Sequence, residues 1–396
     1  MKLNIMKAAL FFTVLFNLYF PKGGIKVGGI PLTIGLFLLG MWLLIGFVST
    51  LFKWNKNVLS YDRVIIVLSW MPFQMLVLFL AITNDVESAG MYFSMLFNFI
   101  FLPWMLLVFN GQNFDTKVDK EFLFKLFKYG VLFVAVFGLI NFGYKGITGD
   151  YIEIPFLTSN YDDVGLLYEK DNARGDIGKL ISTYQNGNLY GISLLMLLPL
   201  FCYLDKNTKH QFIVKLSIFL TLSRTVWVGL ILYELLNAVA FSKIKIKNLF
   251  YMCIFFVVFI IGVSYIMDSI GLDPSFLLDS SLGGRLNNSA ADTSWSWLPT
   301  EPIHGFSEIV YKGVIDVFGI VGIICFSIGF FSPTLLYVKN HLGKSPYYKA
   351  VFFGLFIYYV ISMGDGAILL IPVMVFYWFL VLLLTGNSYV NRNIGL

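Results

Sequence analysis

Apolar stretches long enough to cross a bilayer recur along the whole chain, and short polar segments separate them. A helix rises about 1.5 Å per residue, so about 20 apolar residues cross the hydrocarbon core. The pattern therefore predicts an all-α integral membrane protein, a polytopic bundle with about twelve transmembrane helices. The spans are expected near residues 4–20, 30–51, 64–83, 90–110, 123–142, 188–204, 211–223, 225–241, 249–267, 307–337, 350–363 and 367–385.

Composition supports this class. Hydrophobic residues make up 58% of the 396 residues and charged residues only 13%, whereas a soluble domain carries about a quarter charged residues. We expect one polytopic membrane domain over residues 1–396.

Cys202, Cys253 and Cys325 all lie in apolar stretches, so neither a disulfide framework nor a thiolate metal site is expected.

The basic residues predict the orientation. With the amino terminus inside, most of the 28 Lys and Arg residues lie on the inner side, including the basic segments 205–215 and 243–247. Both termini are then cytoplasmic. The net charge of +5 reflects inner loops that face an anionic leaflet, so it does not indicate nucleic-acid binding.

Two outer loops are long, residues 143–187 and residues 268–306. The first is acidic and carries tyrosines and amides, among them Tyr184, Asn186 and Asn188, and the second carries Trp295. Aromatic rings cover the apolar face of a sugar, and amides bind its hydroxyls. These four residues are candidates for glycan binding. An ordinary solvated loop is the alternative interpretation.

Arg224 lies between two apolar segments that are short for a bilayer. Residues 211–222 would form only about 18 Å of helix, against about 30 Å of hydrocarbon. Two short spans with Arg224 at the outer turn keep both basic segments inside, whereas one span over 211–241 would separate them. A permanent charge at membrane depth indicates a functional site, usually for an anion.

Arg174 and Arg285 also fall on the outer side. The planar guanidinium group gives paired, charge-assisted hydrogen bonds and stays charged, which suits a diphosphate. Three such residues in one outer mouth predict a site for a lipid-linked diphosphate. The alternative is that some of them are interface anchors or partners of nearby acids.

His304 is the one histidine expected on the outer side, which makes it a candidate general base. Glu301, Glu308 and Asp316 are rival bases. His304, Glu308, Lys312 and Asp316 are spaced four apart, so on one helix they would share a face. Lys312 as an ion-pair partner of Glu308 or Asp316 is the structural alternative.

The sequence carries no zinc-ligand cluster, Walker loop or dinucleotide fingerprint, so we expect no metal and no cofactor. Asp162-Asp163 is a weak candidate for holding a divalent cation on the outer side.

Residues 182–191 (STYQNGNLYG) and 221–227 (TLSRTVW), together with Arg285, His304 and Gly319-Ile320-Val321-Gly322, give the chain a family resemblance. It resembles the superfamily of O-antigen polymerases and O-antigen ligases, which are bacterial inner-membrane glycosyltransferases. The resemblance covers residues 170–325, and the Ser-Arg-x-x-Trp element is its most specific part.

The resemblance implies a metal-independent, inverting glycosyltransferase on the periplasmic face of a bacterial inner membrane. It would move a growing glycan from undecaprenyl diphosphate to a lipid-linked repeat unit. Arg224 and Arg285 would hold the diphosphate, and Arg174 would match the basic residue of the first large loop. His304 would take the family's role of base or acceptor-positioning residue.

The family's histidine lies about one turn nearer to the Gly-x-x-Gly helix than His304 does, which leaves Glu301 and Glu308 open as bases. The expected partners are undecaprenyl-diphosphate-linked oligosaccharide and polysaccharide, membrane lipids and a chain-length regulator protein, with no nucleic acid.

Two other functions remain open. An O-antigen ligase shares the donor but passes the glycan to lipid A–core, and the acidic balance of residues 143–187 favours the polymerase over it. A flippase for lipid-linked oligosaccharides would need charge along a central path. Glu234 is the main deep charge, and it is expected to bond a neighbouring span.

Overall fold

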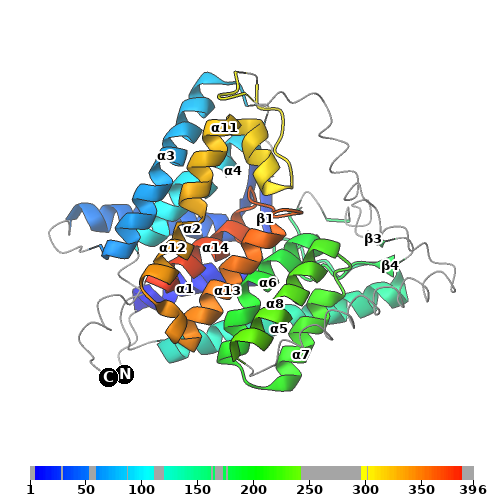
Figure 1. Cartoon of the computed structure of the whole chain (residues 1–396). Coiled ribbons are helices and arrows are strands. Elements are labelled where there is room, and N and C mark those ends of the chain that lie inside the picture. Colours follow the sequence, from blue (N-terminus) through cyan, green and yellow to red (C-terminus); the bar gives the residue numbers. More distant parts are fainter. Residues whose placement is uncertain are drawn as a thin grey trace.

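The computed structural model describes residues 5–27, 30–52, 59–86, 88–110, 120–161, 164–165, 173–174, 177–241, 296–300 and 302–385. Over these residues the regular secondary structure is helical apart from two short β-hairpins (Figure 1). The first half contains α1 (Ile5–Tyr19), α2 (Ile34–Phe52), α3 (Tyr61–Thr83), α4 (Ala89–Leu96) and α5 (Lys120–Thr148). The second half contains α6 (Gly187–Leu204), α7 (Thr208–Phe219), α8 (Arg224–Phe241), α11 (Val310–Phe330), α12 (Ser332–Lys339), α13 (Pro346–Ile361) and α14 (Ile371–Thr385).

Shorter elements complete the described part of the chain. After α4 the chain continues through two π-helical segments, Phe97–Phe101 and Trp104–Phe109. Leu342–Lys344 form a 3₁₀ turn. Strands β1 (Gly24–Val27) and β2 (Ile30–Thr33) pair antiparallel with Gly24 opposite Thr33. Strands β3 (Ala173–Arg174) and β4 (Ile177–Gly178) pair in the same way. The hydropathy pattern had predicted neither hairpin.

Six helical segments of the described chain are long and apolar enough to cross a membrane. They are Ile34–Phe52, Tyr61–Thr83, Ala89–Phe109, Phe122–Thr148, Gly187–Leu204 and Val310–Lys339. The fold is therefore that of an all-α membrane protein. The count of twelve spans stays a prediction, because the span expected near 249–267 lies outside the described residues and several other helices are shorter than a bilayer.

Helices α6 and α14 form the centre of the bundle. Nearly every side chain of α14 is buried, and α6 is buried from Tyr190 to Cys202. A helix that is apolar all round belongs inside a bundle. In contrast, α2 leaves large apolar side chains such as Phe37 and Leu44 exposed, as expected for a helix that faces lipid.

Residues 211–241 form two helices, as predicted. Helix α7 ends at Phe219 and α8 begins at Arg224. Leu222 has a φ of 52°, a left-handed conformation that no α-helix continues through. The break lies directly before the arginine that the sequence had marked.

The deep carboxylate of α8 has the partner that was predicted for it. Glu234 Oε1 lies 2.6 Å from Lys215 Nζ of α7, and the same ammonium lies 5.3 Å from the centroid of the Tyr233 ring. The prediction that Glu234 bonds a neighbouring span is confirmed. An ion pair between adjacent helices is the usual way to keep two charges inside a membrane.

Helix α11 is two helices joined by a sharp bend at Gly319, which has φ 70° and ψ −168°. Figure 1 shows the two halves descending on either side of this bend. The amide groups of Ile320 and Val321 donate to the carbonyl oxygens of Ser296 (3.1 Å) and Trp297 (3.3 Å). The segment Val310–Lys339 is long and apolar enough to cross a membrane, as expected near 307–337, but its helix is interrupted at Gly319, because a backbone with positive φ cannot continue a helix.

The prediction that His304, Glu308, Lys312 and Asp316 share one helix face is only half correct. Lys312 and Asp316 do lie one turn apart on α11, with Lys312 Nζ 2.7 Å from Asp316 Oδ2. His304 and Glu308 precede the helix, which begins at Val310, so they do not share its face. Spacing by four aligns side chains only within one continuous helix.

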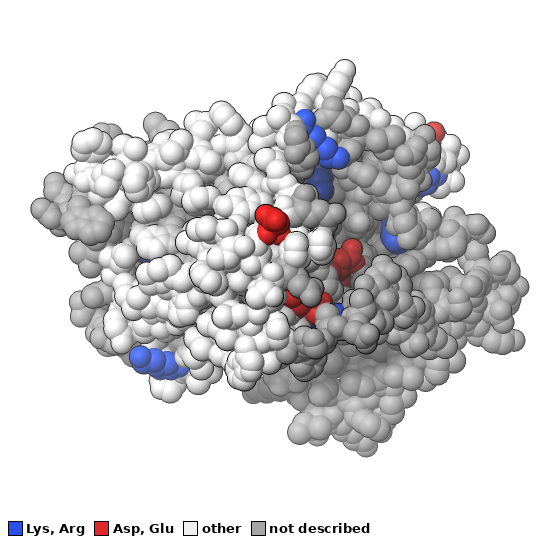
Figure 2. All heavy atoms as spheres, turned by 90° about the horizontal axis from the view of Figure 1, so that it is seen from above, with Lys and Arg blue, Asp and Glu red and all other residues white. Residues whose placement is uncertain are grey.

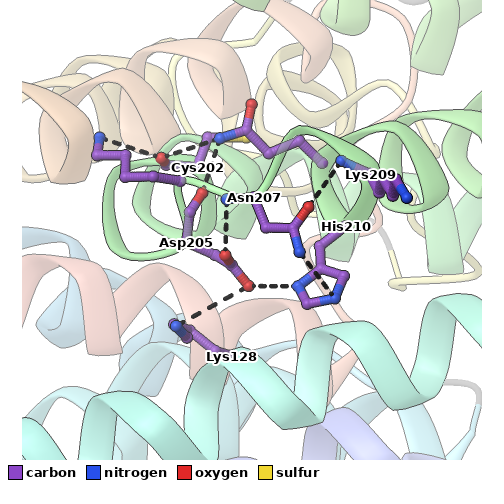
Figure 3. Close-up of polar contacts among 8 residues, drawn as sticks. Lys128, Cys202, Asp205, Asn207, Lys209 and His210 are labelled. Atoms are coloured by element: carbon purple, nitrogen blue, oxygen red, sulfur yellow. Dashed lines mark hydrogen bonds and ion pairs between the residues drawn. The ribbon is translucent and has the colours of Figure 1, made fainter.

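A polar cluster joins α5, α6 and α7 at the end of the bundle opposite Arg224 (Figure 3). Asp205 Oδ1 accepts from the amide of Asn207 at 3.0 Å, and its Oδ2 lies 2.9 Å from His210 Nδ1 and 3.9 Å from Lys128 Nζ. Burial raises the pKa of Asp205, but the hydrogen bonds from Asn207 and His210 and the charge of Lys128 together hold it below its ordinary value.

We expect Asp205→Asn to lower the melting temperature by about 2–4 °C at neutral pH. The folded pKa lies below the unfolded one, so the ionised carboxylate stabilises the fold above about pH 4 and loses this effect as pH falls through the folded pKa. Thermal unfolding of the purified protein between pH 7 and pH 3 measures the difference. Lys209→Ala is the control, because only the backbone of Lys209 enters the cluster. A deficit that does not shrink in acid would contradict the assignment.

We expect Gly319→Ala to destabilise the fold by about 1–3 kcal/mol, since alanine is strained at positive φ. Its Cβ would lie 2.6 Å from the Trp297 carbonyl oxygen and 2.7 Å from that of Ser296. Gly40→Ala is the matched control, because no atom lies within 4 Å of the added Cβ and alanine favours a helix. Equal melting temperatures for the two variants would show that the bend does not depend on glycine.

Candidate functional site

Two central helices, α13 and α14, are much shorter than α3 and α5. Helices α13 and α14 have 16 and 15 residues, so each is only about 23 Å long at 1.5 Å per residue. Helices α3 and α5 have 23 and 29 residues, which gives about 35 and 44 Å. The connections between the central helices can therefore lie well inside the bundle.

Two hydrogen bonds fix the depth of these connections at the end where α8 begins. Ser182 Oγ donates to the carbonyl oxygen of Val134 at 2.7 Å, a residue about 20 Å along α5 from its end at Thr148. Asn98 Nδ2 donates to the carbonyl oxygen of Ile368 at 3.2 Å, and Asn98 lies about 13 Å along the chain axis from the start of α4. The segments around Ser182 and Ile368 thus lie below the ends of α4 and α5.

Four connecting segments meet at this depth, and we call them the sunken turns. They are residues 180–188, 220–225, 308–310 and 362–368. The amide of Leu180 donates to the carbonyl oxygen of Leu220 at 3.0 Å, and the amide of Gly366 donates to that of Glu308 at 3.1 Å. Asn188 Nδ2 donates to Asp365 Oδ2 at 3.0 Å and so links these two pairs of segments, which brings residues 177 positions apart into one site.

The backbone of the sunken turns is strained. Six non-glycine residues of the described chain have a left-handed φ. Four of them lie in these turns: Ser182 (49°), Gln185 (59°), Leu222 (52°) and Ala367 (47°). Such conformations cost about 1–3 kcal/mol each and concentrate at functional sites. The strain is a reason, independent of the charges, to regard the sunken turns as the working part of the molecule.

Arg224 is the first residue of α8 and is half-buried. Its guanidinium stays charged at any physiological pH, and the amino terminus of a helix adds partial positive charge. A second cation, Lys179, is buried beside the start of α6. The position of a Cβ on Gly187 would lie 3.3 Å from Lys179 Cβ. Figure 2 looks onto this end of the bundle and shows, among the described residues, acidic side chains near the middle of the face with basic ones around them.

Asp365 is a site residue that the sequence analysis missed. It is only 3% exposed, lies between α13 and α14, and accepts a hydrogen bond from Asn188 Nδ2 at 3.0 Å. The available signal was a carboxylate between two glycines in a short connection between predicted spans. Glycines flank carboxylates in many ordinary loops, so this pattern alone does not indicate a functional site.

The candidate glycan-binding residues Tyr184, Asn186 and Asn188 lie around the start of α6. Tyr184 is buried, with its ring edge-to-face against Tyr190 at a centroid distance of 5.6 Å, so the ring offers no open face to a sugar in this structure. Asn186 caps α6 by accepting from the amides of Asn188 and Leu189. Asn188 is half-buried and directs its amide group at Asp365.

The candidate bases Glu308 and His304 are both exposed but have different neighbours. The backbone of Glu308 is bonded to the Asp365 turn through Gly366. The segment that holds His304 is bonded instead to the connection between α3 and α4, where the amide of Ile303 donates to the carbonyl oxygen of Asp85 at 2.7 Å. Of the two, Glu308 is the one joined to the sunken turns.

The remaining candidates cannot be located at the side-chain level. Arg174 belongs to strand β3, and nothing is described of its side chain. Arg285, Trp295, Glu301 and the Asp162-Asp163 pair lie outside the described residues.

The described part of the large loop 143–187 is packed against α5 and α6. Helix α5 extends to Thr148, so the loop begins later than predicted. Tyr151 is buried, and its hydroxyl donates to the carbonyl oxygen of Lys179 at 2.9 Å. Burial raises the pKa of Tyr151 to about 12. Tyr161 is exposed and stacks on Phe156 at a centroid distance of 5.0 Å, which makes this pair the open aromatic surface of the described loop.

Among the residues that the structure describes, no group of three or more His, Cys, Asp or Glu side chains could hold a metal ion. The chemistry that the sunken turns can supply is a fixed cation at Arg224, a buried carboxylate at Asp365 and an accessible carboxylate at Glu308. This set suits binding of an anionic group beside a site that accepts a proton.

Comparison with known proteins adds no assignment to this chemistry. No model of a known protein family matches the chain, and no curated protein matches it. The function is therefore argued from the residues themselves and from the resemblance of residues 182–191 and 221–227.

Proposed function

We propose that this protein is a polymerase of O-antigen or a related surface polysaccharide. It transfers a growing glycan from undecaprenyl diphosphate to a lipid-linked repeat unit at the periplasmic face of a bacterial inner membrane. The observation that carries the proposal is the location of Arg224, a half-buried arginine at the start of α8 within strained turns below the bundle surface.

Arg224 would bind the diphosphate of the donor. In the proposed reaction, the acceptor hydroxyl attacks the anomeric carbon of the donor glycan, and the bond from that carbon to the phosphate oxygen breaks. The electron pair leaves with the diphosphate, whose charge the guanidinium stabilises through paired hydrogen bonds. A site recessed from bulk water strengthens this interaction, because the local dielectric constant is low.

Glu308 is the group we propose as the general base, in preference to His304. Its backbone is bonded to the turn that contains Asp365, and that turn packs against Thr225, the neighbour of Arg224. A base must come within about 3 Å of the hydroxyl that it deprotonates. The sequence alone favoured His304 because it is the one histidine expected on the outer side. The contacts of the two segments favour Glu308.

A deletion strain and its glycans test the function as a whole. Loss of a polymerase leaves single repeat units on the lipid A–core, whereas loss of a ligase leaves bare core and lipid-linked polymer. Purified protein that elongates synthetic lipid-linked repeat units in vitro would support the polymerase directly. Transbilayer movement of these lipids without elongation would indicate a flippase.

We expect Arg224→Lys to lower the transfer rate at least about 100-fold, because lysine cannot form the paired hydrogen bonds of a planar guanidinium. The variant keeps the positive charge and should insert and purify normally. The measurement is elongation of lipid-linked repeat units, with melting temperature as the check on folding. A near-normal ladder of chain lengths would exclude the diphosphate role.

We expect Glu308→Gln to lower the transfer rate by about 10²–10⁴, the range for loss of a general base, while donor binding is largely kept. His304→Ala should have a smaller effect. Transfer rates over a pH series compare the two variants. If His304→Ala is the inactive one and Glu308→Gln is nearly silent, the histidine is the base and the argument from the Gly366 contact fails.

A further inference from the structure

Asp365 carries a carboxyl group at a buried position, where removing such a group from water costs free energy. It is only 3% exposed and lies below the surface of a membrane bundle. Removing a carboxylate from water costs several kcal/mol unless hydrogen bonds or charges compensate it. An apolar residue would fill the same space without that cost. The contacts of Asp365 therefore indicate what the residue is for.

The backbone around Asp365 is held on both sides. A Cβ on Gly364 would lie 3.2 Å from Thr225 Oγ1, and a Cβ on Gly366 would lie 2.3 Å from Val310 Cγ2. The carbonyl oxygen of Gly366 accepts a hydrogen bond from the Tyr358 hydroxyl at 2.8 Å. These close approaches hold the backbone on both sides of Asp365, and its side chain contacts Asn188 of α6.

Asn188 meets Asp365 with a defined orientation. The amide of Asn188 presents its NH₂ group to Asp365, whose side-chain oxygen accepts the hydrogen bond. The observed bond runs from Nδ2 to Oδ2 at 3.0 Å. Asn188 is the second residue of α6, directly after the glycine that begins the helix.

The hydrogen bond joins two segments that each touch the turn containing Arg224. The α6 side touches it at Thr221, whose carbonyl oxygen lies 3.2 Å from the Cβ position of Gly187. The α13–α14 side touches it at Thr225 through Gly364. Residues 221–225 therefore lie between two supports that the Asn188–Asp365 bond ties together.

We propose that Asp365 is a positioning residue that acts through Asn188 to hold residues 221–225, and with them Arg224, in the geometry that binds the donor diphosphate. The inference rests on the proposed function for its effect on transfer. We call the Asn188–Asp365 bond and the two segments that it joins the clamp. The clamp is a property of the fold and can be measured without any substrate.

Exchanging the two side-chain types tests the pair. Asn188→Asp puts two carboxylates together and should lower kcat/KM for the lipid-linked donor about 10- to 100-fold, the scale of coupling between contacting residues. Asp365→Asn should cost less, because two amides can still bond. The double variant N188D/D365N restores one donor and one acceptor, so its activity should return to within about fivefold of the parent protein. Leu335→Ala, a change at an exposed position of α12 outside the sunken turns, is the control.

Hydrogen–deuterium exchange of residues 220–226 in the parent protein and the same four variants provides the second measurement. Protection should fall in Asn188→Asp and return in the double variant. Losses that simply multiply in the double variant, or an Asn188→Asp protein as active and protected as the parent, would overturn the proposal. If the parent protein transfers no glycan at all, the proposed function fails, and the exchange data still decide whether the clamp exists.

Discussion

Hydrocarbon offers no hydrogen-bonding partner to a peptide group, and the whole arrangement follows from this constraint. Inside a bilayer the backbone must bond to itself, so the chain crosses as helices and can change direction only where protein encloses it. The sunken turns satisfy this condition. Their amides and carbonyls bond to one another and to α4 and α5, as in the bonds of Leu180 to Leu220 and of Gly366 to Glu308.

Enclosure explains how short helices can occupy the centre of the bundle. Helices α6, α13 and α14 are surrounded by protein, so their ends need not reach the membrane boundary. Longer helices such as α3 and α5 extend past them, which leaves irregular backbone below the surface without exposing it to lipid. The bend of α11 at Gly319 satisfies the same constraint. The amides of Ile320 and Val321, which lack helical partners there, donate to the carbonyl oxygens of Ser296 and Trp297.

The sequence was sufficient for features that have a strong local or compositional cause. Apolar runs predicted the helices, and the basic segments on either side of Arg224 predicted the break before α8. It was insufficient where distant contacts decide. Gly319 in an apolar run looks like any helical glycine, because its bend depends on carbonyl groups more than 20 residues earlier. Asp365 is joined to Asn188, 177 positions away in the sequence, a contact that no local pattern indicates.

The charges of the described chain illustrate one further point about function. Lys215 and Glu234 neutralise each other between α7 and α8, and Lys312 and Asp316 do so on α11, so these pairs carry no net charge for a ligand. At the sunken turns, Asp365 accepts a hydrogen bond from the amide of Asn188, and Arg224 begins α8 in the adjacent turn. A recess that brings a guanidinium group and carboxylates together suits glycosyl transfer from a diphosphate, because the leaving diphosphate gains negative charge and the acceptor hydroxyl loses a proton.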